Sequence, residues 1–127
     1  MKQAKSNIAG VNVMVYLGDI AVPGVIKPKV DRMDLFYGKT VVANLEGLIT
    51  FRYEDLIKEN KLFSNDLVID FLKYICVKAV TLANNHVTDV PEAFDRTKEI
   101  LDANGIQYCG AGLTIEEAQK SVIVDDK

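Results

Sequence analysis

Short apolar runs alternate with amphipathic stretches along most of the chain. Apolar residues dominate positions 11–17, 40–43, 79–83, 106–109 and 121–124, and each run has the length of a strand. Strands that are apolar on both faces are typical of sheets covered on both sides. The pattern therefore predicts five buried strands over these residues.

Two stretches between these runs have the period of a helix. Ser64 or Asn65 can cap the first helix, whose inner face holds Leu67, Val68, Phe71, Leu72 and Ile75. Asp89 precedes the second helix, which has Pro91 in its first turn and ends at Gly105. Its predicted inner face holds Phe94, Thr97, Ile100 and Leu101.

A third, short helix is predicted after Thr114, because Thr114 and Glu117 have the spacing of a capping box. Residues 48–64 have mixed polarity and yield no assignment. Strands that alternate with helices indicate an α/β fold with a mostly parallel sheet and flanking helices. A length of 127 residues fits one domain, residues 1–127.

Composition narrows the possible partners. The net charge is -3 and Lys and Arg form no stripe, which argues against nucleic acid or an anionic membrane. Asn12, Gly18 and Pro23 interrupt the apolar residues between 8 and 26, so a strand and loop are expected there and no membrane segment. The chain is predicted to be cytoplasmic, or membrane-associated if an N-terminal anchor has been removed. Cys76 and Cys109 are predicted to be reduced core residues.

Polar side chains follow three consecutive predicted strands. Asp19 follows the first, Asn44 and Glu46 the second, and the third is followed by Asn84, Asn85, His86 and Asp89. Since ligands bind beyond the carboxyl ends of strands in open α/β sheets, these residues predict a site. Carboxylate and amide oxygens suit Mg²⁺ or Mn²⁺, and imidazole adds Zn²⁺ or Fe.

Structural roles for the same residues remain open at this point. Asp19 follows a glycine and could form a turn, and Asp89 could cap the next helix. Asn84 and Asn85 could be turn residues that tolerate a left-handed backbone. His86 is the single histidine of the chain, and a lone histidine is often structural.

These segments also carry a resemblance. Residues 17–20 (LGDI), 44–50 (NLEGLIT) and 81–89 (TLANNHVTD) resemble successive motifs of the CapA family of poly-γ-glutamate capsule proteins. Residues 105–106, 110–112 and 116–118 also resemble that family's pattern, and the similarity covers residues 11–124. The resemblance implies a calcineurin-like metallophosphoesterase fold, a four-layered α/β/β/α sandwich, of which this chain would form half.

The resemblance also implies roles for individual residues. Asp19, Glu46 and Asn85 match metal-ligating positions for a divalent ion (Mn, Mg, Zn or Fe). His86 matches a histidine that contacts a phosphoryl group and acts as general acid, and Asp89 matches an acidic residue that orients it. A capsule polymer or a phosphorylated precursor is the implied ligand.

Two departures from the family pattern shape the functional prediction. Ala21 stands where classical phosphoesterases place a histidine, and the family's later His-Trp-Gly-type segment is absent, so the domain is expected to be truncated. The chain is predicted to serve capsule synthesis with a partial metal site and to form a homo-oligomer that covers its sheet. The alternative is a non-catalytic truncated domain or binding subunit.

Overall fold

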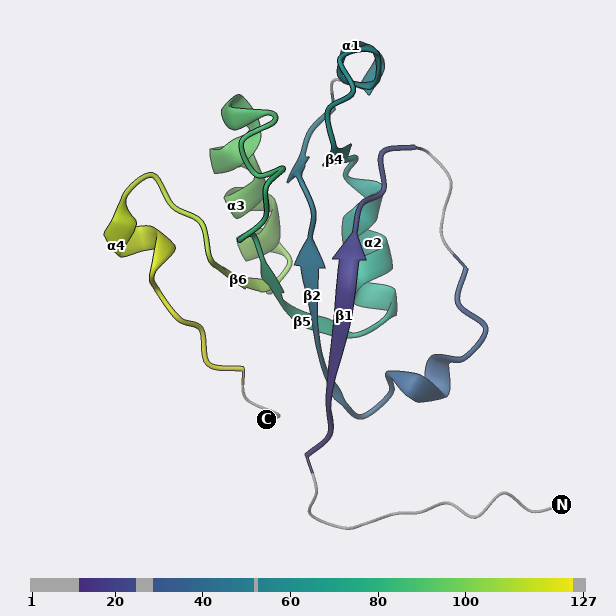
Figure 1. The fold of residues 1–127 in the computed structure, drawn as a ribbon. Helices are drawn as coiled ribbons and strands as arrows, with labels where there is room; N and C mark the ends of the chain where they lie inside the picture. Colours follow the sequence, from purple (N-terminus) through teal and green to yellow (C-terminus); the bar gives the residue numbers. More distant parts are fainter. Residues whose placement is uncertain (1–11, 25–28, 52, 125–127) are drawn as a thin grey trace, which may run out of the picture.

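A four-stranded parallel sheet organises the fold (Figure 1). The computed structural model of the chain describes residues 12–24, 29–51 and 53–124. The strands are ordered β1-β2-β5-β6 and all pair in parallel: β1 (Met14–Ile20), β2 (Thr40–Leu45), β5 (Val77–Thr81) and β6 (Gln107–Cys109). A separate parallel pair joins β3 (Leu48–Ile49) to β4 (Phe63–Ser64). The predicted α/β fold with a mostly parallel sheet is confirmed, and it is consistent with half of an α/β sandwich.

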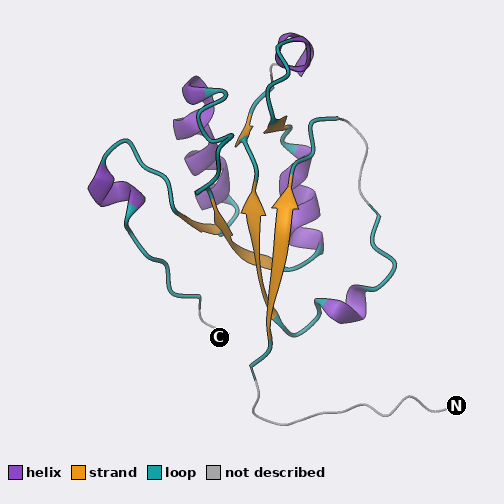
Figure 2. Cartoon of the chain, viewed as in Figure 1, coloured by secondary structure: helices purple, strands orange, loops and turns teal. Residues whose placement is uncertain are grey.

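Two helices cover one face of this sheet. Both α2 (Leu67–Tyr74) and α3 (Phe94–Ala103) lie behind the strands in Figures 1 and 2. A 3-10 turn, η2 (Pro91–Ala93), leads into α3, so the proline stands at the start of the helix as predicted. The remaining helical segments are short: η1 (Met33–Leu35), α1 (Tyr53–Lys58) and α4 (Ile115–Ala118).

The hydrophobic core lies between the sheet and these two helices. Val41 and Leu45 of β2 are fully buried, as is Leu72 of α2, and Val80 of β5 is almost fully buried. Leu101 of α3 is fully buried on the predicted inner face, next to Thr97. Each side chain of this size stabilises the fold by about 1.5–3 kcal/mol when it leaves water, so this face alone anchors both helices.

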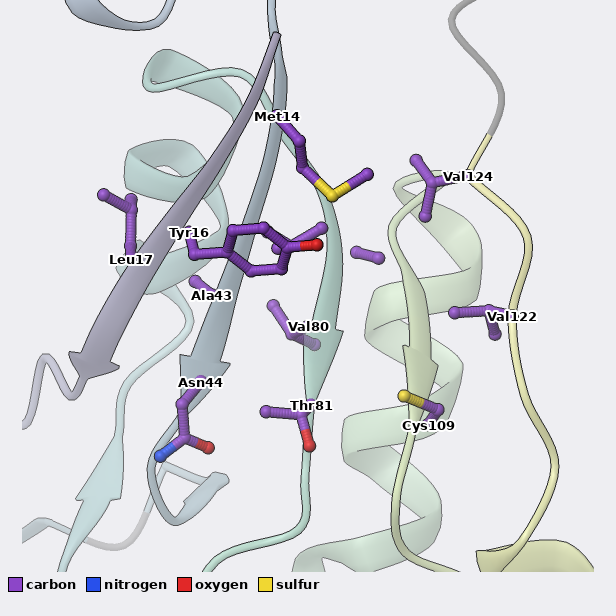
Figure 3. Close-up of a pocket in the computed structure, with 12 residues that line it drawn as sticks. Met14, Tyr16, Leu17, Ala43, Asn44, Val80, Thr81, Cys109, Val122 and Val124 are labelled. Atoms are coloured by element: carbon purple, nitrogen blue, oxygen red, sulfur yellow. The ribbon is translucent and has the colours of Figure 1, made fainter.

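Within the described residues, neither α2 nor α3 covers the opposite face of the sheet (Figure 3). Register places Tyr16 beside Val42 and Ala79, and Asn44 beside Thr81 and Cys109, in two rows across the strands. A hollow of about 400 Å³ lies over these rows. The side chain of Tyr16 in this hollow is 75% exposed. The sheet thus keeps one apolar face open within the described residues.

The predicted fifth strand, residues 121–124, is wrong. Within the described residues this segment pairs with no strand; it runs past the open face, where Val122 and Val124 border the hollow and Ile123 is 79% exposed. The segment alternates because it is extended and turns only Val122 and Val124 toward the sheet. The helix before it is as predicted, since the Thr114 hydroxyl accepts the Glu117 N–H at 3.2 Å.

Other boundaries shifted by a few residues. The first strand was predicted at 11–17 and lies at Met14–Ile20, while residue 11 lies outside the described residues. The unassigned stretch 48–64 contains β3, α1 and β4. Two-residue strands are too short to produce a hydrophobic period, which explains why the pattern did not indicate them. Cys76 and Cys109 are both free and half-buried.

Gly47 turns the chain from β2 into β3 with a φ of +74°. A Cβ at this position would collide with the backbone carbonyl of Leu62. Gly105 has a similar φ of +67° but has nothing within 4 Å of the same point. A Cβ at Gly105 would therefore cause backbone strain alone, whereas a Cβ at Gly47 would cause both strain and a steric collision.

We expect Gly47→Ala to destabilise the protein more than Gly105→Ala. Gly105→Ala should cost about 1–2 kcal/mol, the strain of a left-handed residue with a Cβ, whereas Gly47→Ala adds the displacement of β4. Urea unfolding of both variants measures the difference. Equal losses would show that the loop at Leu62 yields freely.

Candidate functional site

The carboxyl ends of β1, β2 and β5 meet at one edge of the sheet, and polar side chains gather there. Asp19 in β1 lies beside Asn44 in β2, and the Asn44 amide Nδ2 donates to Asp19 Oδ1 at 2.7 Å. The Oδ1 atom of Asn44 accepts from Asn84 Nδ2 at 3.0 Å. A series of hydrogen bonds therefore runs from β1 through β2 to the loop after β5.

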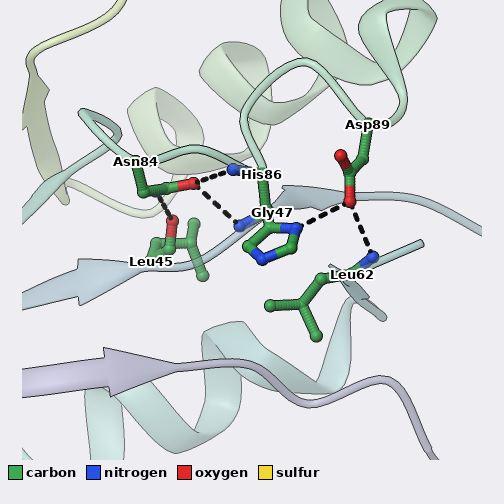
Figure 4. Close-up of polar contacts among 6 residues, drawn as sticks. All are labelled: Leu45, Gly47, Leu62, Asn84, His86 and Asp89. Atoms are coloured by element: carbon green, nitrogen blue, oxygen red, sulfur yellow. Dashed lines mark hydrogen bonds and ion pairs between the residues drawn. The ribbon is translucent and has the colours of Figure 1, made fainter. Parts of the chain in front are cut away.

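The side chain of Asn84 makes four of the hydrogen bonds in this network (Figure 4). Besides Asn44, its Nδ2 donates to the backbone carbonyl of Leu45 at 2.9 Å. Its Oδ1 accepts the backbone N–H of His86 at 3.1 Å and that of Gly47 at 3.4 Å. The amide thus ties the turn after β2 to the loop that carries the histidine.

His86 and Asp89 form a hydrogen-bonded pair in that loop. His86 Nδ1 lies 2.8 Å from Asp89 Oδ2, and the same carboxylate oxygen accepts the backbone N–H of Leu62 at 2.9 Å. Their side chains are 32% and 23% exposed. Asp89 therefore holds the imidazole by a hydrogen bond, and Val90 stands at the N-cap of the following 3-10 turn.

The charge of Asp89 determines which ring nitrogen of His86 carries a proton. Desolvation by burial would raise the pKa of Asp89, but hydrogen bonds from Leu62 and His86 outweigh it and hold the pKa below its usual range. An ionised carboxylate can only accept, so Nδ1 of His86 must carry a proton. Nε2, which points away from Asp89 in Figure 4, is the ring atom left for a ligand.

The remaining predicted ligands lie outside this chain of hydrogen bonds. The Glu46 side chain is half-buried, and its backbone N–H donates to Ile20 at 3.0 Å. Asn85 and Asp19 are exposed. Asp19 and the His86 loop are thus connected through Asn44 and Asn84. Glu46 and Asn85 are neighbours of these residues along the sequence.

The donor types suit a divalent metal ion, but their arrangement is not a ready-made metal centre. Among residues 12–24, 29–51 and 53–124, no three His, Cys, Asp or Glu side chains come together in a way that could hold an ion. Tight metal sites use three or four protein ligands converging on one point. The described residues therefore contain no preformed group of this kind built from His, Cys, Asp or Glu.

Sequence reasoning identified the residues of the network but not its connections. Asn44 was predicted as a possible ligand and Asn84 as a ligand or a turn residue, yet each bridges two neighbours. The spacing of asparagine near strand ends was the available signal. No sequence signal indicated the hydrogen bond from Leu62 to Asp89, because Leu62 contributes a backbone N–H from a segment without a hydrophobic period.

The fold and the site define a class: an α/β domain with a histidine–carboxylate pair and asparagines at the carboxyl edge of a parallel sheet. A family profile described as bacterial capsule synthesis protein PGA_cap matches residues 26–127. The chain belongs to this family, which gives it a function associated with capsule synthesis. No curated protein matches the chain.

The match includes the asparagine-histidine motif and the loops on both sides of it. The CapA-type resemblance noted from the sequence is thereby confirmed. None of the helices in the described part of the chain has the length and apolar character that a membrane span requires.

We expect Asp89→Asn to destabilise the protein by about 1–3 kcal/mol at neutral pH, since a neutral amide oxygen makes weaker hydrogen bonds to Leu62 and His86 than the charged Oδ2 does. The folded-state pKa of Asp89 is lowered, so its ionised form stabilises the fold above the ordinary value of about 3.9. That contribution is lost as the pH falls through the lowered value.

Urea unfolding at neutral pH and in the acid range measures this effect. The difference between wild type and Asp89→Asn should shrink on acidification. Glu99→Gln, an exposed neutralisation on α3, is the control and should change stability little. A difference that stays constant down to low pH would contradict the assigned role of the Asp89 charge.

Proposed function

We propose that the carboxyl edge of the sheet binds an anionic group of a capsule precursor or polymer, either a phosphoryl group or a carboxylate. The observation that carries this proposal is the His86–Asp89 pair, which leaves Nε2 free at the edge where Asp19 also lies. A protonated imidazole donates Nδ1–H to Asp89 and Nε2–H to an anionic oxygen. The same proton can pass to a leaving group, which is general acid chemistry.

A divalent ion such as Mn²⁺, Mg²⁺, Zn²⁺ or Fe²⁺ is proposed to bind only weakly, through Asp19, Glu46 and Asn85. Carboxylate and amide oxygens support this choice of ions. The lack of a converging three-ligand group among the described residues supports weak affinity. When bound, such an ion would offset the negative charge of a phosphoryl oxygen.

A non-catalytic binding role is the alternative function, and a specific observation favours it. A hydrolytic two-metal site needs ions that clamp both the attacking and the leaving oxygen, and among the described residues no three His, Cys, Asp or Glu side chains gather in a way that could hold an ion. His86 alone supplies proton transfer and orientation. The chain is then a binding or assembly subunit in capsule synthesis.

Because His86 is the single histidine, its ring nitrogens can be observed without overlap. We expect saturable shifts of the His86 ring signals when inorganic phosphate, or a short γ-glutamyl peptide, is added to histidine-labelled protein. Asp89→Asn should weaken the effect, because the ring loses the charged acceptor that orients it. Mn²⁺ should broaden the same signals only at high concentration.

The outcome separates the two functions. Shifts without hydrolysis of a chromogenic phosphodiester in the presence of Mn²⁺ indicate binding alone. Hydrolysis that is lost in His86→Ala indicates an enzyme. Ring signals that respond to neither phosphate nor peptide would remove the site from consideration.

We further propose that two copies of the chain pair through the open face of the sheet. The described residues that border the hollow include no charged side chain, so a second copy meets them without like-charge repulsion. Met14 is 45% exposed and Tyr16 75% exposed there. Apolar area of this kind marks interaction surfaces more often than free surface.

We expect light scattering to give twice the mass of one chain, and Tyr16→Glu to give the mass of a single chain. A carboxylate on the open face would have to be buried without a partner in the dimer. Tyr37→Glu, at a residue that is also exposed but lies outside the hollow, is the matched control and should leave the mass unchanged. A wild-type protein of single-chain mass would refute the dimer.

A further inference from the structure

The orientation of the Asn84 amide is determined by its backbone partners. The Leu45 carbonyl can only accept a hydrogen bond, so the atom facing it must be Nδ2. The N–H groups of Gly47 and His86 can only donate, so the atom facing them must be Oδ1. A flipped amide would face like with like at all three contacts.

Asn44 inherits its orientation from Asn84. Since Asn84 presents Nδ2, Asn44 must present Oδ1 to it, and this leaves Nδ2 of Asn44 for Asp19. Every donor in the series therefore points toward Asp19: from the His86 N–H to Asn84, from Asn84 to Asn44, and from Asn44 to the carboxylate. Aligned amides polarise one another, which strengthens each hydrogen bond.

We propose that Asn44 and Asn84 are positioning residues, which together form an amide bridge between Asp19 and the His86 loop. The bridge holds Oδ1 of Asp19 and leaves its Oδ2 for a ligand. At the other end it fixes the backbone from which the imidazole projects. This inference rests on the proposed function for its purpose, because it assigns the residues that set the distance between the two ligand-facing groups.

Asn44→Asp tests the bridge most directly. It replaces the donor to Asp19 with a second carboxylate at a contact that is 2.7 Å long in the wild type, and like charges at this separation repel strongly. We expect lower stability and a displaced His86 backbone amide signal, since residue 44 is pushed from its place against Asn84. Phosphate affinity at His86 should fall about tenfold, as is typical for residues that orient a site.

The swap Asn44→Asp with Asp19→Asn should restore the bridge. Asn at position 19 can donate to Asp at position 44, which still accepts from Asn84, so each hydrogen bond is regained with the net charge of the wild type. Stability and the His86 amide signal should return close to their wild-type values. Gln107→Glu adds a charge at an exposed position of β6 and should change neither.

The result is decisive in each direction. Wild-type stability and an unmoved His86 signal in Asn44→Asp, or a swap that restores neither, would overturn the bridge. If Asn44→Asp does not fold, Asn44→Ala removes the bridge without adding charge and should displace the same signal. A wild-type protein whose His86 signals respond to neither phosphate nor the γ-glutamyl peptide would end the proposed function, while the swap would still test the bridge on ligand-free protein.

Discussion

Parallel strands end together at one edge, and the backbone groups that leave the sheet there have no further strand to pair with. In this protein the side chain of Asn84 makes the hydrogen bonds that a neighbouring strand would otherwise make. It satisfies the carbonyl of Leu45 and the N–H groups of Gly47 and His86. Unpaired backbone groups are costly when they are buried, so the loops of the site depend on this one amide.

A second connection extends the same principle away from the sheet. Asp89 binds the backbone N–H of Leu62, just before β4, and at the same time the ring of His86. The small β3–β4 unit is thus fastened to the β5–α3 loop by the residue that orients the histidine. Stability and site geometry are coupled here, because the carboxylate oxygen that holds the loop also sets the tautomer of His86.

The sequence predicted the α/β class, the two covering helices and the edge at which the polar side chains gather, because apolar periodicity and strand-end polarity are local signals. It misplaced residues 121–124, since an extended apolar segment and a strand have the same alternation and differ only in pairing. It also missed β3 and β4, which are too short to have a period. The bridge through Asn44 and Asn84 depends on strand register, which no local pattern specifies.

The charge arrangement restricts what the proposed site can bind. Asp19 and Asp89 both contribute carboxylates at the same edge, and Asp89 is kept ionised by its hydrogen bonds. An anionic ligand that approached Asp19 alone would be repelled. It requires a positive charge between the two, supplied either by a protonated His86 or by a divalent ion held at Asp19. The amide bridge carries no charge of its own, so it can fix the separation of Asp19 and His86 without contributing to that balance. The positive charge that attracts an anion is therefore proposed to come from the proton at Nε2 or from an added ion, while the bridge affects affinity only through the positions in which it holds Asp19 and His86.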